Sequence, residues 1–337
     1  MKILYRYVVK NILKNFLILI AVFSVVIVSS QLLHLPSVMY HANITNFFKL
    51  LFLINLSFLK FQLLFAFFLS TALLGFNMRE NREIYAVYSA GISKNQLLKP
   101  ILVISIFVFA LSTIVSMFLV PYANRERAKF ITLNIKRYFL DSVQEKNFFQ
   151  LSDKVTIYTE KKEGNRFENV FIYNKERGQA ISAKEAYFDT TTFFLKKGYI
   201  QIPGEKGFNI LRFESYRFNI DVDYLKRYSI EDYRNRDLLM ILKNSKKDKN
   251  KALSVLTDRI LFPIPFIFIG VLGFLVGMNS HKGKDNVIAV SVLISIVYLV
   301  FNFYFIKLIG KGKISPALYF IVITAYFSLI TYYFYRK

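Results

Sequence analysis

Few residues of this chain belong to the types that usually carry catalysis or bind metals. The chain contains no cysteine, which excludes thiolate zinc sites, disulfides, iron–sulfur clusters and cysteine nucleophiles. Its three histidines, His34, His41 and His281, are scattered, so a histidine metal site or a Ser-His-Asp triad would lack partners. A membrane enzyme is therefore the least favoured class of function, and we expect no cofactor.

No segment of the chain predicts an ATPase site. A phosphate-binding loop of the type G-x-x-x-x-G-K-[ST] does not occur, and the run Gly310-Lys311-Gly312-Lys313 has the wrong spacing. The long apolar segments also contain no Asp or Glu, the residues that usually form proton relays and sodium sites. A transport function would therefore need a separate cytoplasmic motor, although a sodium site lined by backbone carbonyls stays open.

One short polar segment could contact such a motor. It runs from Arg79 to Pro100 (RENREIYAVYSAGISKNQLLKP). Four of its residues lie near one face of a predicted amphipathic helix: Glu83, Ala86, Val87 and Ala90. Gly91 can supply the left-handed turn that ends this helix, and Ser93 can cap the next helix. An interfacial turn without a partner is the alternative interpretation.

The composition predicts the elements that must position this segment. The chain is 54% hydrophobic and contains 36 Phe, yet it carries 45 Lys and Arg against 22 Asp and Glu. Apolar and charged residues must therefore alternate in blocks, which is typical of membrane spans. A net charge of +23 also suits nucleic-acid binding. The basic residues form no recognisable binding motif, however, so we expect no nucleic-acid partner.

Six segments contain the roughly 20 apolar residues that a membrane-spanning helix needs. The predicted spans are Asn15–Leu33, Phe58–Met78, Pro100–Tyr122, Ile260–Met278, Val287–Ile306 and Ile314–Tyr335. A cleaved signal peptide is the alternative for the first segment, but its apolar run is long and no small-x-small cleavage site follows. We therefore expect an α-helical membrane protein with three spans on each side of one large polar domain.

The basic residues of the short loops predict the orientation in the membrane. They gather at the N-terminus, between the second and third spans, and at the C-terminal pair Arg336-Lys337. The opposite short loops hold only Lys49, Lys311 and Lys313. Both termini are therefore predicted to be cytoplasmic in a bacterial inner membrane, with the large polar domain on the outer side.

The polar stretch from 123 to about 256 has the composition of a soluble domain. Arg125–Asp141 is predicted as a helix, and Ile230–Leu256 as helix and linker returning to the membrane. Between them, short alternating runs separated by turn residues predict five or so strands in an antiparallel sandwich or open roll. A plain β core with one solvated face is the favoured interpretation. The dense Phe and Tyr residues also permit an interior that holds an acyl chain.

The run Glu83–Ser93 (EIYAVYSAGIS) resembles the coupling-helix signature E-I-x-A-x-x-x-A-G-I-S of the LptF/LptG family, the lipopolysaccharide-export permeases. Other parts of the chain are similar to the family as well. They are the opening ILYRYVVKNILKNF, the strand ISAKEA at 181–186, Arg259 with Pro263 at the fourth span, and Ile314-Ser315-Pro316 at the last span. The resemblance covers the whole chain. The Tyr-Arg-Tyr opening slightly favours an LptF-like over an LptG-like permease.

The resemblance implies a transport subunit that is not itself an enzyme. In this family two homologous permeases pair with a cytoplasmic ABC ATPase dimer, extract lipopolysaccharide from the inner membrane and pass it to periplasmic bridge proteins. The resemblance also implies that the polar domain is a periplasmic β-jellyroll whose interior guides acyl chains. The expected regions are 1–122 with a coupling helix at about 80–91, the periplasmic domain at 123–256 with flanking helices, and the last spans at 257–337.

Two sets of site residues follow from the resemblance. The expected ATPase contact is centred on Glu83 and includes Arg79, Arg82, Tyr85, Ala86 and Gly91. The expected substrate gate lies at the outer end of the first span, where family members carry basic residues and this chain has Gln31 and His34. This is a departure, because Gln is neutral and His is only partly charged near pH 7. Lys60 could supply the missing cation, or could simply snorkel to the interface.

Two other functions stay open. A permease of another ABC exporter, moving a different lipid or a lipoprotein, would need the same coupling helix and outer domain. A membrane-anchored envelope scaffold would bind proteins without transport, and it predicts that no ATPase partner exists.

Overall fold

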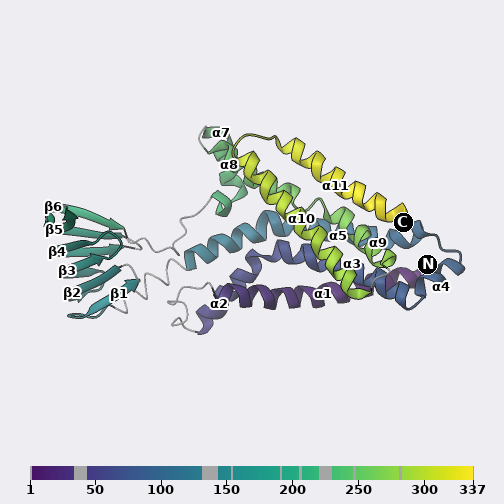
Figure 1. Ribbon diagram of the computed structural model, residues 1–337, viewed down its shortest axis with the longest axis horizontal. Coiled ribbons are helices and arrows are strands. Elements are labelled where there is room, and N and C mark those ends of the chain that lie inside the picture. The colour runs from purple at the N-terminus through teal and green to yellow at the C-terminus, as the bar shows by residue number, and fades with distance from the viewer. Residues whose placement is uncertain are drawn as a thin grey trace. The chain divides into compact units, whose positions relative to one another are not determined.

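The computed structural model describes residues 2–33, 44–130, 143–152, 155–189, 192–204, 207–219, 230–245, 248–280 and 283–336. The chain divides into two compact units. The first contains residues 1–34, 51–125 and 228–337, and the second contains residues 35–50 and 126–227. The first unit is helical and the second carries a β-sheet (Figure 1).

The helical unit is built from long helices with short elements between them (Figure 1). Its first half contains α1 (Lys2–Leu32), α3 (Leu59–Glu80), α4 (Glu83–Ser89) and α5 (Lys94–Ile114). A π-helical segment, Val115–Leu119, follows α5, and the helix then continues to Phe130. The second half contains a 3₁₀ turn (Ile230–Asp232), α7 (Asn235–Asn244), α8 (Lys249–Leu261), α9 (Phe266–Asn279), α10 (Lys284–Gly310) and α11 (Pro316–Arg336).

Each of the six predicted spans falls on these helices. Among the described residues, five helices are long and apolar enough to cross a membrane, and α8 with α9 forms a bent pair that brings the number to six. The bend of 48° lies within the fourth predicted span. Its physical cause is the Phe262–Pro265 break, since Pro263 and Pro265 lack the N–H that a continuous helix needs.

One described helix was not predicted. Helix α2 (Ile44–Ser57) occupies a stretch that the sequence analysis treated as the loop containing Lys49. It has 14 residues, which is about 21 Å of helix and too short for the hydrocarbon core of a bilayer. Its apolar residues show that a connection between spans can itself be a short apolar helix.

The backbones of α3 and α9 approach each other at glycines. A Cβ added at Gly277 would collide with the carbonyl oxygen of Ala72, and one added at Gly75 would collide with that of Phe274. Small residues allow this close packing between helices in a membrane, where the hydrophobic effect does not drive their association. The pair α3–α9 therefore forms the rigid centre of the helical unit.

The second unit carries one antiparallel sheet whose six strands lie in sequence order (Figure 1). The strands are β1 (Phe148–Ser152), β2 (Val155–Glu163), β3 (Arg166–Asn174), β4 (Gln179–Asp189), β5 (Thr192–Gly204) and β6 (Gly207–Asn219). The predicted antiparallel strands are therefore confirmed, whereas the jellyroll that the resemblance implies stays a prediction. The helix predicted at Arg125–Asp141 is present as far as Phe130, and its remainder lies outside the described residues.

The alternation of buried and exposed residues along β4 shifts by one position partway along the strand. On β4 the buried positions pass from Ile181 and Ala183 to Ala186 and Phe188, so the alternation slips by one residue. Asn169 on β3 and Lys197 on β5, at the same level, have left-handed backbones with φ of 48° and 52°. Such irregularities bend a sheet. Buried residues from both sides of this level share one apolar cluster, so the core of the sheet continues across it.

Candidate functional site

The predicted motor-contact segment contains a short helix with well-formed ends. Helix α4 covers Glu83–Ser89, and Gly91 follows with φ of 75°. The backbone N–H of Gly91 donates to the Tyr88 carbonyl at 2.9 Å, and that of Ile92 donates to the Val87 carbonyl at 3.3 Å. These two bonds form a Schellman motif, which confirms the predicted left-handed turn.

The start of α5 is also fixed locally. The Ser93 hydroxyl accepts from the Gln96 backbone N–H at 3.3 Å, and the Gln96 side chain accepts from the Ser93 N–H at 3.0 Å. This reciprocal pair is a capping box, so the predicted cap at Ser93 is confirmed. The two turns hold α4 in a defined orientation between α3 and α5.

Helix α4 presents a surface of small and aromatic residues. Ile84 is buried and anchors the helix against the apolar cluster of the helical unit. Tyr85 is 64% exposed, and Ala86 and Ala90 are exposed beside it. This short helix therefore has an exposed face of small and aromatic residues and one buried residue that packs against its own chain.

Glu83, the predicted centre of the contact, lies at the start of α4. Its carboxylate accepts a hydrogen bond from the Tyr7 hydroxyl at 2.7 Å and one from the Asn81 side-chain amide at 3.3 Å. Arg82, just before it, is exposed and has a left-handed backbone with φ of 61°. The N-terminal helix α1 therefore helps to orient the acidic side chain.

The ends of α9 and α11 meet the same region (Figure 1). Arg79, at the end of α3, donates to the backbone carbonyl of Ser280 after α9. The Tyr88 hydroxyl lies 3.8 Å from the Met278 sulfur, and burial raises the pKa of this hydroxyl above its ordinary value. At the other end of the segment, Lys94 donates to the Tyr335 carbonyl at 2.7 Å. Movement of α4 would therefore act on several helices at once.

The residues predicted for the substrate gate are only partly placed. Gln31 lies in the last turn of α1 and is half-buried. His34 lies outside the described residues, so the substrate gate expected at these two residues stays a prediction. Lys60 lies at the start of α3 with a side chain 12% exposed.

Lys60 has an acidic partner that the sequence analysis did not identify. Its ammonium nitrogen lies 2.6 Å from Asp258 Oδ2 on α8, and the Asp258 side chain is 19% exposed. The aromatic rings of Phe61 and Phe262 cover the ammonium group at 5.0 and 4.8 Å. Asp258 lies between the predicted linker, which ends at Leu256, and the predicted fourth span, which begins at Ile260.

The Asp258 carboxylate is held from a second side. Its Oδ1 atom accepts a hydrogen bond of 3.0 Å from the Asn302 side-chain amide on α10. The Asn302 carbonyl oxygen in turn accepts from the Tyr319 hydroxyl on α11. One acidic side chain therefore joins α8 to α3, α10 and α11.

Arg259, the next residue of α8, forms a second polar network. Its guanidinium donates to the Glu231 carbonyl at 2.7 Å, the Tyr233 carbonyl at 2.9 Å and the Asn235 side-chain oxygen at 2.5 Å. The Asn235 amide donates to the Met117 carbonyl at 3.0 Å, within the π-helical segment where helical hydrogen bonding is irregular. The arginine thus fixes the chain that precedes α7.

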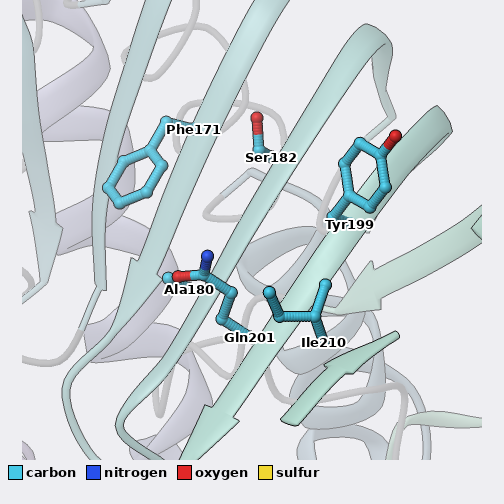
Figure 2. A pocket seen from close by; sticks show the side chains of 6 residues that line it. All are labelled: Phe171, Ala180, Ser182, Tyr199, Gln201 and Ile210. Atoms are coloured by element: carbon cyan, nitrogen blue, oxygen red, sulfur yellow. The ribbon is translucent and has the colours of Figure 1, made fainter. Parts of the chain in front are cut away.

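A shallow hollow lies on the sheet face opposite the buried core (Figure 2). Its volume is about 280 Å³, and two cross-strand rows line it: Phe171, Ser182 and Tyr199, and Ala180, Gln201 and Ile210. Tyr199 is 50% exposed and Ile210 is 60% exposed. The hollow therefore combines apolar surface with a few polar groups on a solvated face.

Comparisons with known proteins show which family the chain resembles. The family described as "Lipopolysaccharide export system permease LptF/LptG" matches residues 6–337. An uncharacterised protein of Rickettsia prowazekii (strain Madrid E) is 25% identical over 214 residues, which cover 59% of this chain and 58% of that protein. The chain thus spans little more than half the length of this relative. The family match covers nearly all of the chain, which belongs to the LptF/LptG family of lipopolysaccharide export system permeases and is a multi-pass inner-membrane protein.

Proposed function

We propose that this chain is the permease subunit of an ATP-driven exporter that extracts lipopolysaccharide from the inner membrane and delivers it to a periplasmic bridge. ATP hydrolysis is supplied by a separate cytoplasmic ABC ATPase dimer, and a second homologous permease completes the complex. The observation that carries this proposal is α4, whose exposed face lies between two fixed turns and whose residues contact α1, α3 and α9.

The proposed motor contact uses the whole end of the helical unit. Tyr85 and Ala86 provide the exposed face, Glu83 provides a negative charge that a basic group of the ATPase can pair, and Gly91 ends the helix. Arg79 and Arg82 add positive charge beside it. In this proposal both termini are cytoplasmic, since Tyr7 and Tyr335 bond to the same region.

The proposed substrate path begins at the outer ends of α1 and α3. Gln31 and His34 take the place of the basic residues that other members carry, and Lys60 is the nearby cation for lipid phosphates. In the described conformation Lys60 is paired with Asp258, so in this proposal a lipid phosphate shares the ammonium group with that carboxylate. The residues 123–256 form the proposed periplasmic domain between the span regions 1–122 and 257–337.

The β-sheet is the proposed route for the acyl chains beyond the membrane. Its aromatic residues support this role, because Phe171 and Tyr199 line a hollow that already mixes apolar and polar surface (Figure 2). Acyl chains gain free energy from apolar contact, whereas the occasional polar groups keep the surface compatible with water.

Affinity purification of the tagged chain from its native membrane tests the proposal. We expect an ABC ATPase, a second permease and lipopolysaccharide to co-elute, and we expect Glu83→Lys to lose the ATPase while the second permease stays. Lys161→Met, in the exposed Lys161–Glu163 pair of the sheet, is the matched control and should retain all components. A different bound lipid would favour another lipid exporter, and absence of any ATPase under several mild detergents would favour the scaffold.

A further inference from the structure

We propose that the Lys60–Asp258 ion pair is the joint through which movement of α3, driven at its other end by α4, reaches the bent α8–α9 segment. This inference rests on the proposed function, because it assumes that a motor moves α4. It assigns Asp258 as a positioning residue of the transport cycle.

Helix α3 can carry such a movement along its whole length. It is a continuous helix of 22 residues, about 33 Å long, with Lys60 at its second position and Arg79 in its last turn. Only Asn81 and Arg82 separate α3 from α4. A displacement imposed on α4 is therefore passed to Lys60 at the opposite end.

The contacts around Lys60 and Asp258 keep the ion pair together while α3 moves. Both Asp258 carboxylate oxygens have partners, namely Lys60 at 2.6 Å and Asn302 at 3.0 Å. The rings of Phe61 and Phe262 cover the ammonium group. Separation would leave two poorly hydrated charges, which is strongly unfavourable. Asn302, oriented by Tyr319, fixes the direction in which the carboxylate faces.

Asp258 lies close to the break between α8 and α9. It is four residues before Phe262, the first residue of the break between α8 and α9. Helix α9 is already packed against α3 through Gly75 and Gly277, so α8 is the part that needs its own connection. The neighbouring Arg259 binds the carbonyl groups of Glu231 and Tyr233, so displacement of α8 also displaces this segment.

The absence of cysteine in the native chain allows a direct test. A single Lys249→Cys substitution places a reporter thiol at an exposed position of α8. In the purified complex with its ATPase, the rate of maleimide labelling is measured with and without nucleotide trapped by vanadate. We expect the trapped state to change the rate at least threefold. Lys60→Met should remove this change, and Lys161→Met, from the exposed pair in the sheet, should leave it intact.

A second variant separates loss of the joint from loss of the fold. The double substitution Lys60→Met with Asp258→Leu removes both buried charges, and such apolar replacements of an ion pair usually fold. We expect it to assemble with the ATPase but to show no nucleotide-dependent change at the reporter. Lys60→Arg, which retains the charge, should restore at least half of the change.

Two results would overturn the joint: a reporter that does not respond to nucleotide in the native background, or a full response in the double variant. Neither result depends on which lipid the complex transports. If the reporter behaves as expected but the complex moves no lipopolysaccharide, the joint stands and the proposed substrate is wrong.

Discussion

The hydroxyl of Tyr7 donates a hydrogen bond of 2.7 Å to the carboxylate of Glu83, across 76 residues of sequence. It joins the N-terminal helix α1 to the first residue of α4, the proposed motor contact. The bond leaves one carboxylate oxygen for the exposed Asn81 amide and holds the charge at the helix N-terminus, where the helix dipole stabilises it. The N-terminal helix thereby orients the acidic residue at the centre of the proposed contact.

Tyr7→Phe tests this relationship. Loss of a hydrogen bond to a charged group costs about 1.5 kcal/mol or less at an exposed site, which corresponds to at most about a tenfold effect. We expect the ATPase to bind the permease three- to tenfold more weakly, as measured by titration of the purified components. Tyr5→Phe, two positions away, is the control and should leave the affinity unchanged. Equal weakening by both substitutions would contradict the role of the bond.

Gln31→Lys tests the departure from the family at the substrate gate. A lysine at this half-buried position of α1 adds a cation where the proposal places lipid phosphates. We expect the purified complex to bind lipopolysaccharide several-fold more tightly, with the gain reduced at high salt because screening weakens charge pairing. Gln31→Met is the uncharged control. A gain that is the same for both variants would point to apolar contact instead of phosphate binding.

Gly277→Ala tests the close approach of α3 and α9. The added methyl group would collide with the Ala72 carbonyl, a backbone atom that cannot rotate away. We expect destabilisation of about 1–3 kcal/mol, seen as a lower midpoint of thermal unfolding in detergent. In Gly310→Ala the nearest atom is the Ser254 side-chain oxygen at 3.2 Å, which can move, so this control should change the midpoint much less. An unchanged midpoint in Gly277→Ala would show that the helices are farther apart.

Lys197→Gly tests the bend in the sheet. Lys197 has φ of 52°, a left-handed conformation that costs a residue with a Cβ about 1–2 kcal/mol and costs glycine almost nothing. We expect the glycine variant to be as stable as the native protein or up to about 1 kcal/mol more stable, whereas Lys197→Val should be less stable. Unfolding monitored by intrinsic tyrosine fluorescence measures both. A more stable valine variant would exclude the left-handed bend.

The local parts of the site could be predicted from the sequence because local residues determine them. Gly91 adopts the left-handed turn for which glycine is suited, and Ser93 with Gln96 forms a capping box within four residues. The apolar runs likewise predicted the positions of the long helices, since their lengths alone match the bilayer.

The long-range contacts could not be predicted in the same way. The sequence predicts no role for Asp258 because its partner, Lys60, lies 198 residues away and no periodic pattern connects them. The bend of the sheet was also missed, since Lys197 and Asn169 carry no sequence signal for a left-handed backbone comparable to glycine. Both features depend on tertiary packing, which a single sequence does not display.

The central claim is that this chain moves lipopolysaccharide out of the inner membrane, and depletion of the chain in its native cells tests it most directly. Membranes are separated by density after depletion, and the lipopolysaccharide in each fraction is measured. We expect lipopolysaccharide to accumulate in the inner membrane, native chain to reverse this and Glu83→Lys not to reverse it. An unchanged distribution of lipopolysaccharide, in cells that have lost the chain, would contradict the account.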